Sequence, residues 1–218
     1  MKDMSPRAIV RRYREFFAEP GSATLVAVSA FSLFIAWWVN YFAIVLATER
    51  ASNSVTDIVL SNIPVFEVDG FFVYGTFVFA IVTIVIVLLR PRRIPFAFLA
   101  VALFWIIRSG FTMLTHLAPF ETHYASDFGP AITKMFFGGD RFFSAHTGMP
   151  FLAALAFWNN VPLRSFYVFG SIYFGVVVLM GHLHYSIDVA AAFFITYPIY
   201  HIAIWAFPRA YTLFQAEN

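Results

Sequence analysis

The chain of 218 residues contains no cysteine, and only 12% of its residues are charged. The absence of cysteine excludes disulfides, thiolate metal sites and catalysis by a thiol. The charged share is half of the roughly 25% that is usual in a soluble domain. Hydrophobic residues make up 61% of the chain, and they are gathered in long apolar runs. These features indicate an integral membrane protein.

Six apolar stretches are candidates for membrane spans. Each is interpreted as a helix, because a segment surrounded by lipid must satisfy its own backbone hydrogen bonds. The expected fold class is therefore all-α, with six transmembrane helices in one domain over residues 23–207. A basic amphipathic segment, residues 1–22, precedes this domain, and a short tail, residues 208–218, follows it. The six stretches are residues 23–47, 71–89, 94–117, 142–161, 163–183 and 185–207.

Basic residues are unevenly distributed over the two sides of this layout. The side that holds both termini collects Lys2 and nine arginines, whereas the other side holds only Arg50, Lys134 and Arg141 beside seven acidic residues. Loops rich in lysine and arginine stay in the cytoplasm. Both termini are therefore expected to be cytoplasmic, and the other side is expected to face the periplasm, the lumen or the exterior.

The stretch "GHLHYSIDVAAAFFIT", residues 181–196, places His184 four residues before Asp188. On a helix this spacing brings both side chains to one face. The carboxylate can then hold one imidazole nitrogen and favour the charged ring. An ionisable residue inside a span is a functional-site hypothesis by default. The alternative is a structural pair that ties two helices together.

The stretch "GGDRFFSAHTGMP", residues 138–150, precedes another apolar run. Ser144 can cap a helix that begins there, and His146 and Thr147 follow in its first turn. A helix N-terminus offers backbone N–H groups to an anion. The alternative is a capping serine with an interfacial histidine beside it.

Arg108 interrupts the apolar run "FWIIRSGFTML". It lies about 21 Å along a helix from Ile94, in the outer third of the bilayer and at the depth of the two histidines. An arginine there needs a carboxylate or a phosphate as its partner. The alternatives are an ion pair with Asp188 or Asp140, and snorkelling to the surface. In the first span, Asn40 is expected to form a hydrogen bond between helices.

The two motifs together are similar to those of the sphingomyelin synthase-related branch of the type 2 phosphatidic acid phosphatase (PAP2) superfamily. The similarity is carried by "GGDRFFSAHT" and "HYSIDVAAAFFIT", with "RSGFTMLTHLAP" resembling the arginine-bearing third span of that branch. "VTDIV" around Asp57 faintly resembles an element that follows the first span. The resemblance covers roughly residues 105–200 and implies a PAP2-like bundle.

The resemblance implies a reaction through a phosphohistidine, without a metal or another cofactor. His184 takes the place of the nucleophile, Asp188 orients it, and His146 acts first as the acid and then as the base. The phosphate-binding candidates are Arg108, Asp140, Ser144 and Thr147.

The sequence departs from the family pattern in several places. The arginine that the wider superfamily carries six residues before its second histidine is Val178 here. Lys134 and Arg141 have the spacing of its Lys-x6-Arg-Pro signature, but no proline follows. These departures favour the synthase-like branch over an ordinary lipid phosphatase. Within that branch, Ala145 replaces a glycine and Gly138 replaces a frequent cysteine, so the head group and the acceptor stay open.

The expected function is a sphingomyelin synthase-like transfer of a phosphocholine- or phosphoethanolamine-type head group. The donor is a membrane phospholipid, and the acceptor is a lipid alcohol such as ceramide or diacylglycerol. Hydrolysis at the same site is the nearest alternative, and a proton-coupled transporter is a more remote one. No nucleic-acid partner is expected, and self-association is left open.

Overall fold

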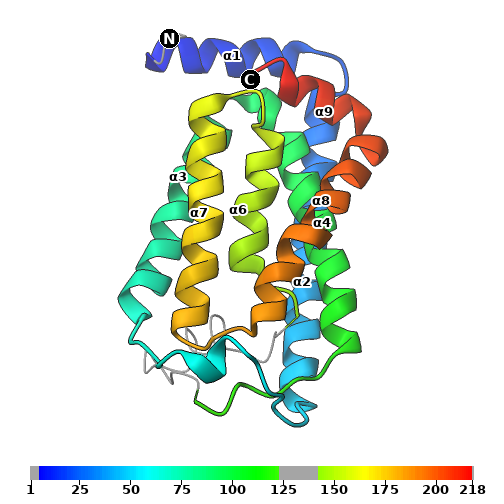
Figure 1. Ribbon diagram of the computed structural model, residues 1–218. Coiled ribbons are helices and arrows are strands. Elements are labelled where there is room, and N and C mark those ends of the chain that lie inside the picture. Colours follow the sequence, from blue (N-terminus) through cyan, green and yellow to red (C-terminus); the bar gives the residue numbers. More distant parts are fainter. Residues whose placement is uncertain (1–4, 123–141, 218) are drawn as a thin grey trace.

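The computed structural model describes residues 5–122 and 142–217, and within them the chain is all-helical, without a strand (Figure 1). Three short helical turns, η1 (Leu60–Asn62), η2 (Gly70–Tyr74) and η3 (Pro91–Arg93), accompany the α-helices. The α-helices are α1 (Pro6–Ala18), α2 (Ser22–Glu49), α3 (Gly75–Leu88), α4 (Ile94–Leu114), α6 (Ala145–Ala156), α7 (Val161–Met180), α8 (Ser186–Ala206) and α9 (Pro208–Gln215).

Five helical segments are long and apolar enough to cross a membrane, which confirms an all-helical integral membrane protein. They are Ser22–Glu49, Gly70–Leu88, Pro91–Leu114, Val161–Met180 and Ser186–Ala206. The remaining expected span, residues 142–161, contains only the 12-residue helix α6. At 1.5 Å per residue this helix is about 18 Å long, well short of the roughly 30 Å hydrocarbon core. The described residues therefore do not confirm six spans.

Helix α6 is short because both of its boundaries are set by local hydrogen bonds. Ser144 caps its first turn, and Asn160 accepts from the Leu163 N–H to cap the helix that follows, so the chain turns at residues 157–160. The adjacent α7 has 20 residues and is about 30 Å long. In Figure 1, α6 accordingly stops well before the far end of α7.

Both termini lie at the same end of the bundle, here called the terminal end; the opposite end is the site end (Figure 1). Ion pairs join the loops at the terminal end. Arg92 pairs with Glu19, and Arg90 Nη1 lies 2.6 Å from Glu217 Oε2. Both contacts bring the α3–α4 connection against the segments that flank the first and last helices.

Helix α1 lies across the terminal end. Its apolar side is packed against the bundle, because Phe16 and Ala8 are buried and the Tyr13 hydroxyl donates to the Leu88 carbonyl at 2.8 Å. Burial raises the pKa of the Tyr13 hydroxyl. The arginine-bearing side, with Arg7 and Arg11, stays exposed. Part of the apolar side of this segment thus packs within the chain, whereas Val10 and Phe17 stay exposed.

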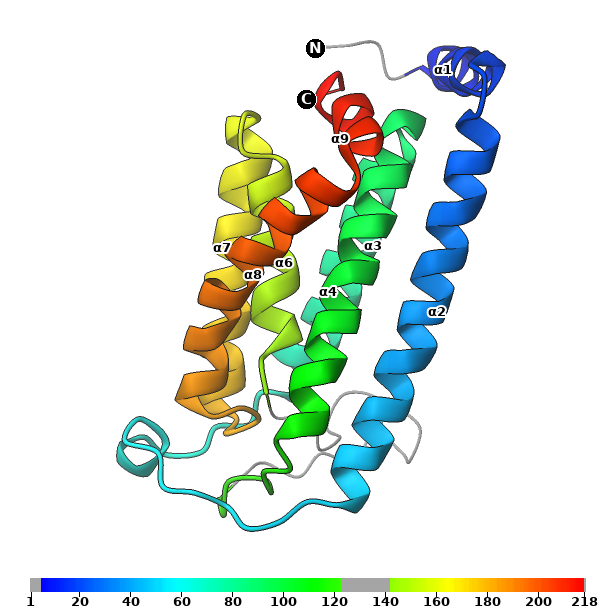
Figure 2. The ribbon, with the colours of Figure 1, turned by 90° about the vertical axis from the view of Figure 1, so that its right-hand side faces the viewer.

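Helix α2 stands at the edge of the bundle and packs against α4 (Figure 2). Its buried side consists mainly of small residues spaced seven apart, which lets the two helices approach closely. In their midst the Asn40 Oδ1 atom accepts from Arg108 Nη1 at 3.3 Å, which confirms the expected hydrogen bond between helices. The small residues are Ser22, Ser29, Ala36 and Ala43.

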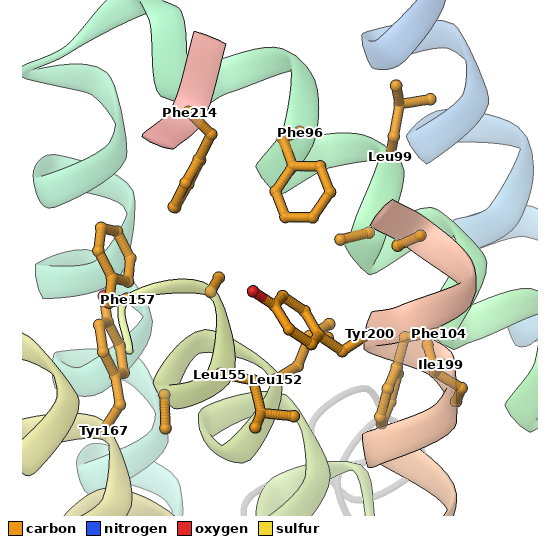
Figure 3. Close-up of a cluster of buried hydrophobic side chains, with 14 of the residues drawn as sticks. Phe96, Leu99, Phe104, Leu152, Leu155, Phe157, Tyr167, Ile199, Tyr200 and Phe214 are labelled. Atoms are coloured by element: carbon orange, nitrogen blue, oxygen red, sulfur yellow. The ribbon is translucent and has the colours of Figure 1, made fainter. Parts of the chain in front are cut away.

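The main hydrophobic core fills the space between α4, α6, α7 and α8 toward the terminal end (Figure 3). Helix α9 closes this core with Phe214, so most of the expected tail is an ordered helix. The site end is left to polar groups and to a smaller apolar cluster. The labelled side chains of the main core are Phe96, Leu99, Phe104, Leu152, Leu155, Phe157, Tyr167, Ile199, Tyr200 and Phe214.

Candidate active site

The start of α8 brings His184 and Asp188 together as the spacing predicts. His184 Nδ1 lies 3.3 Å from Asp188 Oδ2, and the Tyr185 N–H donates to the same oxygen at 3.0 Å. Tyr185 is the N-cap of α8, so His184 precedes the helix and the carboxylate at its third position reaches back to it. The Asp188 side chain is fully buried. It therefore fixes the orientation of the His184 ring through Nδ1, and Nε2 is the ring nitrogen that does not contact Asp188.

The start of α6 has the expected serine cap. The Ser144 Oγ accepts from the Thr147 N–H at 3.4 Å and from the Thr147 hydroxyl at 3.2 Å. The Ser171 hydroxyl on α7 donates to the Thr147 carbonyl at 2.7 Å. Ser144 and Thr147 are both fully buried. Their hydroxyls thus define the helix start, and their part in phosphate binding stays a prediction.

The two motifs meet at the site end although they are nearly 40 residues apart. The Ser144 N–H donates to the Asp188 carbonyl at 3.2 Å, which joins the start of α6 to the first turn of α8. One turn further on, a Cβ placed on Gly148 would lie 2.9 Å from Thr196 Oγ1 and 2.8 Å from Phe104 Cζ. Glycine therefore permits the close packing of α6 against α8 and α4 that keeps the motifs together.

His146 lies in the first turn of α6 and is half-buried. Its ring centroid is 4.5 Å from that of Phe72 and 6.4 Å from that of Phe174. Phe72 belongs to η2, a single turn of π-helix at the start of the second span. Such turns are frequent at functional sites. The aromatic contacts limit the orientation of the imidazole, and nothing in the spacing of the sequence pointed to Phe72.

Arg108 is buried and holds the backbone that leads into α6. Its Nε donates to the Phe143 carbonyl at 2.8 Å, and one helical turn along α4 the Thr112 hydroxyl donates to the Phe142 carbonyl at 3.0 Å. Two side chains of α4 thus fix two successive carbonyls just before Ser144. A contact between Arg108 and phosphate stays a prediction. The candidate Asp140 lies outside the described residues, as do Lys134, Gly138 and Arg141.

Asp57, in the loop after α2, is a site residue that the sequence hardly signals. Its Oδ2 accepts from the Ser186 N–H at 2.7 Å, and its Oδ1 accepts from the N–H groups of Val59 and Leu60 at 2.9 and 3.1 Å. Burial acts to raise the pKa of Asp57, but these backbone donors outweigh it and the pKa is lowered. Asp57 therefore ties this loop to α8 two residues beyond His184.

His182 lies in the turn between α7 and α8, two residues before His184. It has a positive φ of 51°, and its Nδ1 lies 3.0 Å from Thr122 Oγ1. Burial lowers the pKa of its imidazole. His182 thus belongs to the turn that presents His184. Among the described residues, no three histidine or acidic side chains are placed to hold a metal ion.

The comparison with protein families picks out the part of the chain that carries both motifs. Residues 138–205 match the model described as PAP2 superfamily C-terminal. The match supports membership in the PAP2 superfamily. Neither the curated proteins nor the solved structures gave a match. PAP2 proteins are generally phosphatases or phosphotransferases, which supports an enzyme that acts on phosphate esters. The matched residues include His146, His184 and Asp188.

Proposed function

We propose that this protein is a lipid phosphotransferase that works through a phosphohistidine. It moves a phosphocholine- or phosphoethanolamine-type group from a phospholipid to a lipid alcohol such as ceramide or diacylglycerol. The observation that carries the proposal is the fully buried Asp188 at 3.3 Å from His184 Nδ1, joined through its own carbonyl to the start of α6. The resemblance to the synthase-related branch supports the choice of transfer.

In the first step, His184 Nε2 attacks the phosphorus of the donor. A P–N bond forms and the P–O bond to the glyceride oxygen breaks. Because Asp188 holds Nδ1, it stabilises the positive charge that develops on the ring. His146 gives a proton to the leaving oxygen, so that diacylglycerol is released as a neutral alcohol.

In the second step, His146 takes the proton from the hydroxyl of the acceptor lipid. The oxygen attacks phosphorus, the P–N bond breaks, and His184 regains its lone pair. The N–H groups of the first turn of α6 face developing negative charge, as helix N-termini do. Arg108 and Asp140 complete the proposed phosphate subsite, and Ser144 and Thr147 hold its helix start in place.

The site end is assigned to the periplasmic, lumenal or extracellular face. The support comes from the terminal end, where the exposed arginines of α1 and those of the α3–α4 connection gather beside both termini. Basic segments next to spans remain in the cytoplasm. The donor and acceptor lipids would then both come from the leaflet opposite to the cytoplasm.

Lipid product analysis in proteoliposomes tests the proposal. The full-length protein is supplied with a phospholipid labelled in its head group and with ceramide, and the products are resolved by mass spectrometry. We expect a labelled phosphosphingolipid, its loss in His184→Gln, and a decrease of about 10²–10⁴-fold in His146→Gln. His201→Gln is the matched control, because His201 lies on the exposed side of α8.

The products distinguish transfer to a lipid alcohol from transfer to water. A labelled water-soluble phospho-head-group or inorganic phosphate, without a labelled lipid product, identifies hydrolysis by the same histidines. Unchanged lipid turnover in His184→Gln refutes the phosphohistidine mechanism itself.

A further inference from the structure

The loop between α2 and η2 exposes apolar side chains at the site end. Ile58 is 82% exposed and Val55 is 47% exposed, and Val59 beside them is also exposed. On the neighbouring helix Ile187, one residue after Ser186, is 57% exposed. Single exposed apolar side chains are ordinary on a protein surface, but a contiguous group marks a place of contact.

The hydrogen bonds of Asp57 hold the loop so that these apolar side chains stay on its outer surface. Asp57 is turned inward, where it accepts three backbone N–H groups, and Leu60 is 2% exposed. Because Asp57 and Leu60 occupy the inward positions, Ile58 and Val59 between them point outward. In Figure 2 the cyan segment near residue 60 accordingly projects sideways from the bundle, at the end where α8 begins.

The same anchor sets the depth of the loop. Ser186 is the first residue of α8, a helix long and apolar enough to span the membrane, and its N–H lies 2.7 Å from Asp57 Oδ2. Ile58 follows Asp57 directly, so it lies at the level at which α8 begins. The first residue of a helix that spans the hydrocarbon core lies near the boundary between the polar head groups and the acyl chains.

The composition of the loop fits lipid. Between residues 51 and 66 the only charged residue is Asp57, whose carboxylate is turned inward. A loop in contact with water or with a charged partner usually carries charge on its exposed side. The exposed side chains of this loop are uncharged, and Val55, Ile58 and Val59 stand as apolar residues among polar ones at the end of a span, which suits the interface of a bilayer.

We propose that residues 55–59 form a membrane-dipping loop that buries Val55, Ile58 and Val59 among the acyl chains of the leaflet at the site end. Its bilayer contact stands independently of the reaction. Its use rests on the proposed function: the loop is attached to α8 beside His184, so a lipid that moves along it brings its head group to the histidine from within the leaflet.

Site-directed spin labelling tests the bilayer contact directly. The chain has no cysteine, so each cysteine variant of the full-length protein carries one label. Labels are introduced by Ile58→Cys and Val55→Cys, with Ser61→Cys as the matched control, because Ser61 is exposed in the same loop and is polar. In phospholipid vesicles, power saturation compares collisions with oxygen, which concentrates in the bilayer, and with a water-soluble nickel chelate.

We expect the labels at residues 58 and 55 to collide more with oxygen than with nickel, by a ratio at least three times that measured at residue 61. Equal ratios at the three positions, or a greater accessibility to nickel at residue 58, overturn the proposal. Because the readout needs no turnover, it is unaffected by the outcome of the lipid product analysis.

Discussion

Removal of the Asp57 carboxylate is expected to destabilise the protein by about 1.5–5 kcal/mol. Asp57→Ala leaves the buried Leu60 N–H without its acceptor, at a cost of about 1–3 kcal/mol. It also removes the acceptor of the half-buried Ser186 N–H at the start of α8, where the loss of a cap costs about 0.5–2 kcal/mol. The loss of the bond from the part-buried Val59 N–H adds to this cost.

The assay is equilibrium unfolding by dodecyl sulfate in mixed micelles, followed by circular dichroism. Glu67→Ala is the control, since Glu67 is an exposed acid in the same connection, and it should change the unfolding free energy by less than about 0.5 kcal/mol. A cost for Asp57→Ala as small as that of the control refutes the assignment of Asp57 as an anchor.

A double-mutant cycle isolates the bond between the loop and α8. Ser186→Pro removes both Ser186 donors to Asp57, the backbone N–H and the hydroxyl, and proline is well tolerated at the first position of a helix. Asp57→Ala should then cost about 1 kcal/mol less in the Ser186→Pro background than in the parent protein. Strict additivity of the two substitutions shows that the bond contributes nothing.

Two further outcomes concern packing and pH. Gly148→Ala should lower the unfolding free energy by about 1–3 kcal/mol, because the added methyl would lie 2.8 Å from Phe104 Cζ. Gly110→Ala is the control: its methyl meets nothing within 4 Å, so it should be neutral or stabilising. Equal effects of the two substitutions would contradict the packing of α6. The same assay should show stability falling on acidification in two windows. The fold lowers the pKa of His182, so the contribution of His182 to the unfolding free energy is lost as the pH falls below the unfolded pKa of about 6.5. The fold also lowers the pKa of Asp57, so the contribution of Asp57 is lost below about pH 3.9, as the pH falls through this lowered pKa. His182→Gln should remove the first window alone.

The long spans and the two histidine motifs could be predicted because each depends on local signals. A run of about 20 apolar residues needs no partner to identify it. The four-residue spacing of His184 and Asp188, and the serine before His146, likewise fix short-range geometry. The same local rule does not give the length of the helix within residues 142–161, because the apolar run continues through Phe157 but the helix is bounded by caps at Ser144 and before residue 161.

Asp57 and Phe72 could not be found in this way, because their roles come from contacts across the fold. Asp57 reaches an N–H group 129 residues away, and Phe72 packs on a histidine of another helix. Arg108 shows a mixed case. Its position in an apolar run indicated a buried partner, and among the described residues the Phe143 carbonyl and Asn40 are partners of Arg108. The expected carboxylate partner Asp140 lies outside the described residues, so that part stays a prediction.

The short length of α6 also determines where chemistry can occur. Thr147 lies beside Gly175, five residues before the end of α7, so α7 continues about 8 Å beyond the first turn of α6. In the proposed reaction, a phosphate ester at His146 therefore lies below the rim of the bundle and has lost part of its hydration shell. There, each backbone N–H attracts it more strongly than it would in bulk water.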